Sequence, residues 1–238
     1  MKAAHVRYEY KPFYGSSHWW ALRQCTNLPA STRVLDIGSG SGAIGQVLKE
    51  QGVAELYAVE IDAEAREHVK NIYKKIAGDI GEFSGQKFDL ILLLDVLEHM
   101  TDPFAYFGKM VSMLSPGGKI LLSLPNVAHW SVRFLLLFGI FDYHDRGIMD
   151  RTHYQFFTRK RVRQMLRGLS AYSTQAGEPQ LKRCVFDSSI EPVEFLLPEA
   201  MWNNLFWRAI SKVRLAIARI LPGFFAFQHL VLAEKERT

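Results

Sequence analysis

The chain has 238 residues, 48% of them hydrophobic, which is enough to bury one large core, and α/β chains of this size usually form a single domain. The 29 basic and 24 acidic residues give a net charge of +5. Cys25 and Cys184 lie far apart without C-x-x-C spacing, so they indicate neither a disulfide framework nor a zinc site. We therefore expect metal-free chemistry in the cytoplasm.

Export and membrane-spanning segments are not expected. Residues 1–14 mix charged and aromatic side chains and lack the unbroken apolar stretch of a secretory signal. The apolar run 132–141 is too short to span a bilayer, and the run 213–232 contains Arg214, Arg219 and Pro222.

Apolar strands alternate with helices along the first half of the chain. The predicted strands lie at 34–37, 55–61, within 72–80, at 88–94 and at 119–124, and the predicted helices at 43–51, 63–76 and 103–114. Because the apolar strands are flanked by helices, we expect a mostly parallel, doubly wound α/β sheet covered on both faces. Ligands of such sheets bind at the carboxyl ends of the strands.

The second half contains fewer regular elements. Thr158 is predicted to cap a helix over 159–169, and two final strands are predicted at 181–187 and 225–233. Between the core elements lie two insertions, 126–157 and 188–223, which we expect to determine acceptor specificity. Residues 1–30 precede the first strand and are expected to form a lid over the cofactor.

The segment VLDIGSGSGA, residues 34–43, matches two kinds of nucleotide loop. Gly38, Gly40 and Ala43 fit the G-x-G-x-x-G/A pattern of dinucleotide sites. Gly38, Gly40 and Gly42 behind Asp36 also fit a loop that holds S-adenosylmethionine. A carboxylate at position 36 would repel a pyrophosphate but suits the sulfonium and ammonium groups of S-adenosylmethionine.

Two more acidic residues follow predicted strands. Glu60 could accept hydrogen bonds from ribose hydroxyls of either nucleotide, so it does not discriminate. Asp79 could accept a hydrogen bond from an adenine amino group. Capping or turn formation is the alternative role for Asp36 and Asp79. The combined pattern favours S-adenosylmethionine over a dinucleotide.

The segments VLDIGSGSG, AVEID, GDI, FDLILLLDVLEHMTDP and LSPGGKILLSLPN resemble, in order, the motifs of class I S-adenosylmethionine-dependent methyltransferases. The resemblance implies a Rossmann-like seven-stranded sheet of order 3-2-1-4-5-7-6 with the seventh strand antiparallel. It also implies the cofactor contacts: Asp36, Gly38, Ser39, Gly40 and Gly42 at the methionine end, Glu60 and Ile61 at the ribose, Asp79 and Ile80 at the adenine, and Asp95 and Val96 on the floor of the site.

One departure from other methyltransferases concerns the acceptor. LLLDVLEH lacks the Asn-Pro-Pro-Tyr type of sequence found in many methyltransferases of amino groups and nucleic-acid bases. The resemblance therefore disfavours an exocyclic amine as acceptor.

The second half resembles more particular groups. PNVAHWSVR, DYHDRGIMDRTHYQFFTRKRVRQML and LPGFFAFQHLVLAEK resemble a bacterial subgroup of methyltransferases associated with cell-surface glycan assembly, which implies O-methylation of a glycan or lipid-linked sugar. SLPNVAHWSVR also resembles the MetW family, which implies a noncatalytic S-adenosylmethionine-binding regulator or partner. A quinone or phenol O-methyltransferase is a third alternative.

A hydroxyl acceptor needs a base, and histidines titrate near the working pH. We rank His129 first because it follows the fifth strand closely. His153 comes second, since Asp150 beside it could orient the ring, and His99 comes third because it lies where a helix is expected to begin.

Residues 202–221 predict a basic amphipathic helix. Its apolar residues Trp202, Phe206, Ile210, Val213, Ile217 and Ile220 recur at steps of three or four, opposite Arg208, Lys212 and Arg219. The helix either packs on the core or touches an anionic membrane, which would be the cytoplasmic face of the inner membrane. The basic residues do not form a groove-like pattern, so no nucleic acid is expected as a partner.

Overall fold

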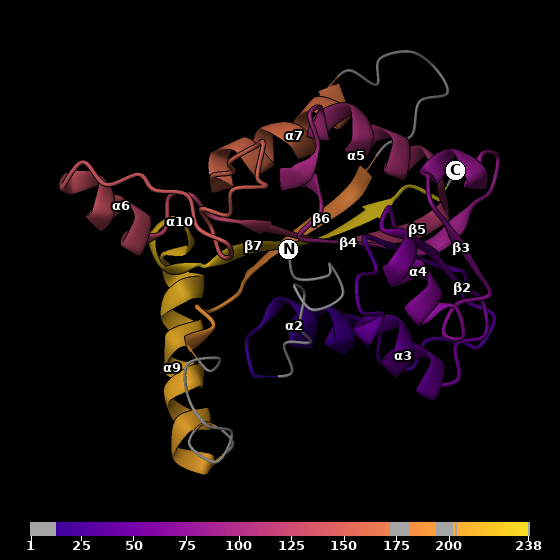
Figure 1. The fold of residues 1–238 in the computed structure, drawn as a ribbon, viewed down its shortest axis with the longest axis horizontal. Coiled ribbons are helices and arrows are strands. Elements are labelled where there is room, and N and C mark those ends of the chain that lie inside the picture. Colours follow the sequence, from indigo (N-terminus) through magenta and orange to yellow (C-terminus); the bar gives the residue numbers. More distant parts are fainter. Residues whose placement is uncertain (1–12, 172–180, 194–201, 203, 238) are drawn as a thin grey trace.

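Seven strands form one sheet in the order β3-β2-β1-β4-β5-β7-β6 (Figure 1). The computed structural model describes residues 13–171, 181–193, 202 and 204–237. The strands are β1 (Val34–Ile37), β2 (Leu56–Val59), β3 (Lys75–Ala77), β4 (Phe88–Leu94), β5 (Leu114–Pro125), β6 (Leu181–Ser188) and β7 (Gln228–Lys235). The pairs among β1 to β5 are parallel, whereas β7 is antiparallel to both β5 and β6. The predicted fold class, strand order and antiparallel seventh strand are therefore confirmed.

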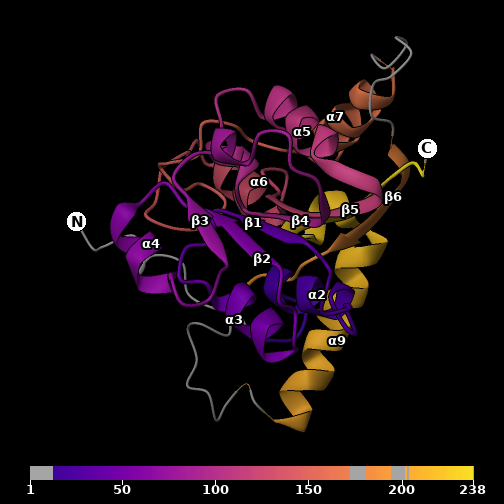
Figure 2. The ribbon, with the colours of Figure 1, turned by 90° about the vertical axis from the view of Figure 1, so that its right-hand side faces the viewer.

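Helices cover both faces of the sheet (Figures 1 and 2). On one face lie α2 (Ser17–Gln24), α3 (Ala43–Glu50) and α4 (Ala63–Val69), and on the other α5 (Pro103–Ser112) and α7 (Arg159–Ala171). Alternation along β1 divides the core, because Val34 packs with the first group and Leu35 with the second. β4 is almost continuously apolar since both of its faces are covered.

Several element boundaries differ from the predictions. α4 ends at Val69, before the predicted 76, because the chain then turns into the short strand β3. β7 begins at Gln228 because a short helix, α10 (Pro222–Phe225), occupies the start of the predicted strand. His99 does not begin a helix but ends the 3-10 turn η2 (Leu97–His99), and α5 begins at Pro103 behind its cap Asp102.

Part of the predicted lid forms α2. Trp20 and Ala21 of this helix, and Cys25 directly after it, are buried in the core cluster of β1 and α3. Residues 1–12 of the predicted lid lie outside the described residues. Within the described part, the segment before β1 packs on the core, and its role as a lid stays a prediction.

The two insertions contain α6 (Trp130–Leu137) and α9 (Leu205–Ile220). The predicted helix at 202–221 is thus confirmed for its main part, but it contacts the protein through Ser211, Leu215 and Ala218 rather than through its apolar stripe. No helix among the described residues is long and apolar enough to cross a bilayer.

Asn126 joins the first insertion to the strand that follows the second. Its buried Nδ2 donates to the carbonyl oxygen of Ala226 at 2.8 Å, and its Oδ1 accepts from the amide of Ala128 at 3.1 Å. Because buried backbone groups that lose a partner are costly, this side chain stabilises the meeting point of β5 and β7.

We predict that Asn126→Ala lowers the free energy of unfolding by about 1–3 kcal/mol, because it removes a hydrogen-bond partner from the buried carbonyl group of Ala226 and from the partly buried amide of Ala128. Urea denaturation would measure the change. Asn71→Ala, at an exposed position, is the matched control and should change stability by less than about 0.5 kcal/mol. Equal effects of the two variants on the free energy of unfolding would contradict the proposal that Asn126 stabilises the meeting point of β5 and β7.

Candidate active site

The glycine loop between β1 and α3 depends on left-handed backbone. Gly38, Gly40 and Gly42 have φ values of 70°, 52° and 71°. A Cβ atom at Gly42 would lie 2.6 Å from Cδ1 of Ile72, and one at Gly38 would lie 3.2 Å from Cγ2 of Val96. Both conformation and space therefore require glycine at these two positions.

Asp36, the next-to-last residue of β1, has a buried carboxylate. The hydroxyl of Tyr73 donates to its Oδ2 at 2.6 Å. Burial raises the pKa of Asp36 to about 6, and the charge of Glu60 acts in the same direction. Gly45 leaves room for the Tyr73 ring, because a Cβ there would lie 2.3 Å from its hydroxyl oxygen. Sequence reasoning missed Tyr73, since nothing in NIYKK indicates a buried partner.

Glu60 follows β2 and fastens the glycine loop to it. One carboxylate oxygen accepts from the amide of Gly40 at 2.8 Å and the other from the amide of Asp62 at 3.0 Å. Each oxygen keeps capacity for a further donor, so these bonds are compatible with the predicted ribose contact. Ile61 follows with 85% of its surface exposed at the same edge of the sheet.

The predicted adenine residues lie after β3. Asp79 caps η1 (Ile80–Phe83), accepting from the amide of Gly81 at 2.6 Å, and Ile80 is buried. Tyr106 of α5 lies within electrostatic reach of Asp79; burial, and secondarily this charge, raise the pKa of Tyr106 to about 12. The structure brings the ends of β1, β2, β3 and β4 to one edge of the sheet, as the sequence predicted.

Asp95 follows β4 in a strained backbone conformation, with φ of 57°. Its carboxylate accepts from Ser123 Oγ and Gln228 Nε2, both at 2.5 Å. Gln228 begins β7, so its approach depends on the antiparallel strand order and was not foreseen. Val96, also predicted for the floor, is buried against the glycine loop.

His129 is a buried helix cap. It precedes α6, its Nδ1 lies 2.8 Å from Ser131 Oγ, and its ring packs against Trp130 and Phe227. Burial lowers its pKa to about 4. Capping and packing are therefore structural roles of His129, and its role as a base stays a prediction.

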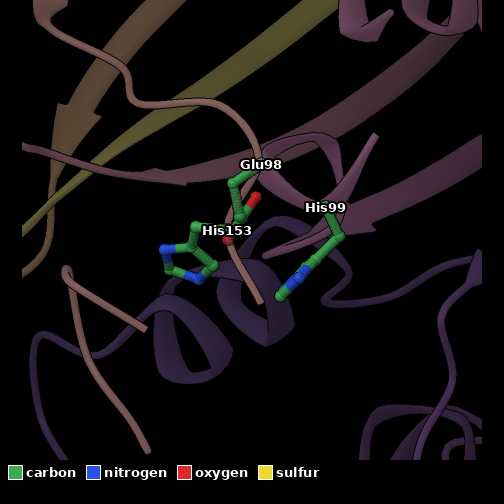
Figure 3. A group of neighbouring side chains, drawn as sticks. All are labelled: Glu98, His99 and His153. Carbon is green, nitrogen blue, oxygen red and sulfur yellow. The ribbon is translucent and has the colours of Figure 1, made fainter. Parts of the chain in front are cut away.

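His99 and His153, predicted separately, form a pair. Their ring centroids lie 4.8 Å apart in an edge-to-face arrangement, and Glu98 lies beside them (Figure 3). Nδ1 of His99 lies 3.0 Å from the carbonyl oxygen of Thr152, and burial lowers the pKa of His153. Glu98 was not among the predicted site residues, because its proximity to His153 arises from folding of the insertion.

Comparison with known proteins identifies the family. The Methyltransferase domain family matches residues 18–169, which is more than half of the chain. The chain belongs to this methyltransferase family. A ubiquinone biosynthesis O-methyltransferase of Xanthomonas axonopodis pv. citri (strain 306) is 30% identical over 112 residues, 41% of this chain and 45% of that protein. The chain spans about half the length of the curated relatives it matches.

Solved structures agree on the fold. A SAM-dependent methyltransferase from Archaeoglobus fulgidus has a TM-score of 0.58 at 17% identity, covering 95% of this chain and 97% of that one. The plantazolicin methyltransferase BpumL, in complex with a monoazolic desmethylPZN analog and SAH, has a TM-score of 0.56 at 17% identity, covering 93% and 82%.

S-adenosylmethionine is the cofactor of this methyltransferase. The buried carboxylates of Asp36 and Glu60 and the left-handed glycines between them fit a cationic nucleoside. The dinucleotide alternative is set aside, since the family and its structural neighbours are methyltransferases.

We predict that Asp36→Asn raises the dissociation constant of S-adenosylmethionine by about tenfold or more, because it removes a negative charge near a cationic ligand. Wild-type affinity should fall as the pH drops through about 6, where Asp36 becomes protonated, and the variant should lack this dependence. Glu60, Tyr73 and Cys25 are its charged or titratable neighbours.

Calorimetric titrations between pH 5 and pH 8 would test this. Asp142→Asn, at an exposed carboxylate, is the matched control and should bind as the wild type does. Unchanged affinity in a folded Asp36→Asn protein would remove Asp36 from the cofactor site.

Proposed function

We propose that this methyltransferase O-methylates a hydroxyl group on a lipid-carried acceptor at the surface of an anionic membrane. The observation that carries the proposal is an exposed apolar surface beside the carboxyl edge of the sheet, formed by α6 and α9. We call it the α6–α9 surface.

The α6 half of this surface is apolar on nearly all sides. Leu137 is 81% exposed, and its neighbours Phe134, Leu136 and Phe138 are exposed as well. The only ionic side chain between positions 126 and 141 is Arg133. An exposed apolar patch of this kind on a monomer marks an interaction site.

The α9 half turns its apolar stripe away from the protein. Phe206 and Ile220 are each 75% exposed, and Val213 and Ile217 between them are exposed as well. No acidic residue occurs from 200 to 224; the four basic residues there are Arg208, Lys212, Arg214 and Arg219. An apolar stripe with basic neighbours is a better match for anionic lipid headgroups than for an acid-rich protein surface.

The two halves are joined at α10. Arg133 of α6 donates to the carbonyl oxygen of Gly223 and lies over the ring of Phe224, 5.4 Å from its centroid. Arg219 pairs with Asp187, which fixes the end of α9 to β6. Figure 1 shows α6 and α9 projecting at the same end of the molecule. These contacts support one continuous surface rather than two separate helices.

The acceptor's head group is proposed from the relatives. The O-methyltransferases that match part of the chain carry ubiquinone biosynthesis in their names, which favours a phenol or quinone precursor with an apolar tail. A lipid-linked sugar is the second candidate, favoured by the resemblance of residues 125–133, 142–166 and 221–235 to glycan-associated methyltransferases. Both acceptors combine a hydroxyl group with a lipid chain, as the α6–α9 surface requires.

The chemistry needs an oriented and activated hydroxyl oxygen. S-adenosylmethionine supplies an electrophilic methyl group on its sulfonium. Asp36, Glu60 and the glycine loop hold this cofactor at the carboxyl edge, so the acceptor must approach from the side of η2 and the first insertion. We propose that His99 and His153, rather than the buried His129, activate the hydroxyl oxygen there.

Labelled S-adenosylmethionine with fractionated cell-envelope lipids should give a lipid-soluble methylated product that survives alkaline hydrolysis, because methyl ethers resist alkali whereas methyl esters do not. His153→Gln should lower this transfer by about 10²–10⁴ while S-adenosylmethionine affinity stays near normal. Water-soluble products alone would exclude a lipid-carried acceptor. Cofactor binding without transfer to any fraction would favour the noncatalytic, MetW-like alternative.

Membrane contact can be measured separately. Wild-type protein should sediment with vesicles containing phosphatidylglycerol and much less with neutral vesicles, whereas Leu137→Glu combined with Phe206→Glu should remain in the supernatant. Phe104→Glu, at an exposed aromatic residue on α5, is the matched control. If the wild type instead forms a dimer that the double variant abolishes, and ignores vesicles, the surface joins two copies and the membrane proposal fails.

A further inference from the structure

Three potential metal ligands meet beside the carboxyl end of β4. Glu98 and His99 belong to η2, whereas His153 belongs to the first insertion. One carboxylate oxygen and one ring nitrogen from each histidine lie within 4.8 Å of one another. Figure 3 shows Glu98 between the rings of His153 and His99. Among the described residues, this is the one group of histidine, cysteine and acidic side chains with such spacing.

Both imidazoles are oriented as metal ligands usually are. Nδ1 of His99 lies 3.0 Å from the carbonyl oxygen of Thr152, and Nδ1 of His153 lies 3.0 Å from that of Ile148. A carbonyl oxygen only accepts hydrogen bonds, so each Nδ1 carries a proton and Nε2 is the ring atom of each histidine that can bind a metal ion. Histidines that bind metals typically have the other ring nitrogen fixed in this way.

Hydrogen bonds to backbone carbonyl oxygens join the two segments that carry these ligands. The amides of Tyr154 and Gln155 both donate to the carbonyl oxygen of Glu98, at 2.9 and 3.0 Å. Nε2 of Gln155 donates to the carbonyl oxygen of Thr101 at 3.1 Å. The ligands are thus carried on a prearranged scaffold, which reduces the entropy lost when a ligand binds.

The charge of the site favours a cation. Glu98 is only 1% exposed. The charges of Asp95 and Asp150 both act to raise the pKa of His153, so both favour a positive charge at its position. Asp150 is itself buried, accepting from both the amide and the hydroxyl of Thr152. Three carboxylates around the two imidazoles form a region of negative potential in which a divalent cation is stabilised.

We propose that Glu98, His99 and His153 bind one divalent metal ion, with Zn²⁺ as the best chemical match. Two imidazoles and one carboxylate form a ligand set of catalytic zinc sites, which leave a further position open. Ligand atoms on a tetrahedral zinc lie about 3–3.5 Å apart, given bonds of about 2.0–2.2 Å. Metal binding would draw the three ligand atoms together from their present separation of up to 4.8 Å.

The ion would give the histidine pair a way to activate the acceptor. This role of the ion rests on the proposed O-methyl transfer. In the open position it binds the acceptor's hydroxyl oxygen and lowers the pKa of that hydroxyl, whose proton passes to solvent. An oxygen lone pair then forms the bond to the methyl carbon. The sulfur–carbon bond breaks, and its electron pair stays on sulfur to give neutral S-adenosylhomocysteine.

Metal binding is tested on chelator-treated full-length protein without cofactor or acceptor. Calorimetric titration with Zn²⁺ should give one equivalent per chain, and Co²⁺ should develop visible absorption bands. Glu98→Gln, His99→Gln and His153→Gln should each weaken Zn²⁺ binding at least tenfold. His153→Asp, which supplies a carboxylate oxygen in place of the ring nitrogen, should bind Zn²⁺ more tightly than His153→Gln. His144→Gln, an exposed histidine of the same insertion, is the matched control.

The outcomes separate this site from the proposed function. Normal S-adenosylmethionine affinity in His153→Gln would show that the variant folds. Substoichiometric Zn²⁺ binding in the wild type, or equal binding in His153→Gln and His144→Gln, would overturn the metal site. Undiminished methyl transfer after metal removal would overturn the metal's role in transfer, whereas a protein that binds Zn²⁺ as expected but methylates nothing would overturn the proposed function alone.

Discussion

Two buried carboxylates at neighbouring strand ends determine the shape of the cofactor site. Asp36 and Glu60 are brought side by side by the parallel register of β1 and β2, and each is held by a specific donor. Because burial of a charge is unfavourable, the pKa of Asp36 rises to about 6, and the site is poised to accept a positive ligand. The left-handed glycines, the packing of Tyr73 and the orientation of α3 all depend on this arrangement.

A second constraint is the docking of the first insertion on η2. Backbone hydrogen bonds to Glu98 bring residues 152–155 to the end of β4, close to where Asp95 joins β7 through Gln228. Residues from β4, the insertion and β7 therefore meet at one edge. The acceptor side of the site is built from long-range contacts, whereas the cofactor side is built mainly from successive strand ends.

The α6–α9 surface lies at the same edge because of the antiparallel seventh strand. β7 returns next to β5, so that Pro125 pairs with Gln228 and the two insertions emerge together. Placing both apolar helices beside the acceptor side gives a route by which an acceptor with a lipid tail could reach the methyl group while its tail stays in a bilayer. The proposed metal site and the apolar surface would then serve the two ends of one acceptor.

The sequence alone predicted the strands and helices of the sheet and the acidic residues and glycines at its strand ends, because local patterns carry that information. Apolar runs, the glycines behind Asp36, and acidic residues at strand ends follow from short-range rules of buried strands and helix starts. The sequence also predicted α9, but not which side would pack, since its periodicity describes an apolar stripe without saying what covers it. Tertiary structure decided that Ser211, Leu215 and Ala218 face the protein. It likewise brought Tyr73 to Asp36, buried His129 as a cap, and joined His153 to Glu98 and His99, because such contacts depend on chain segments that only the folded sheet brings together.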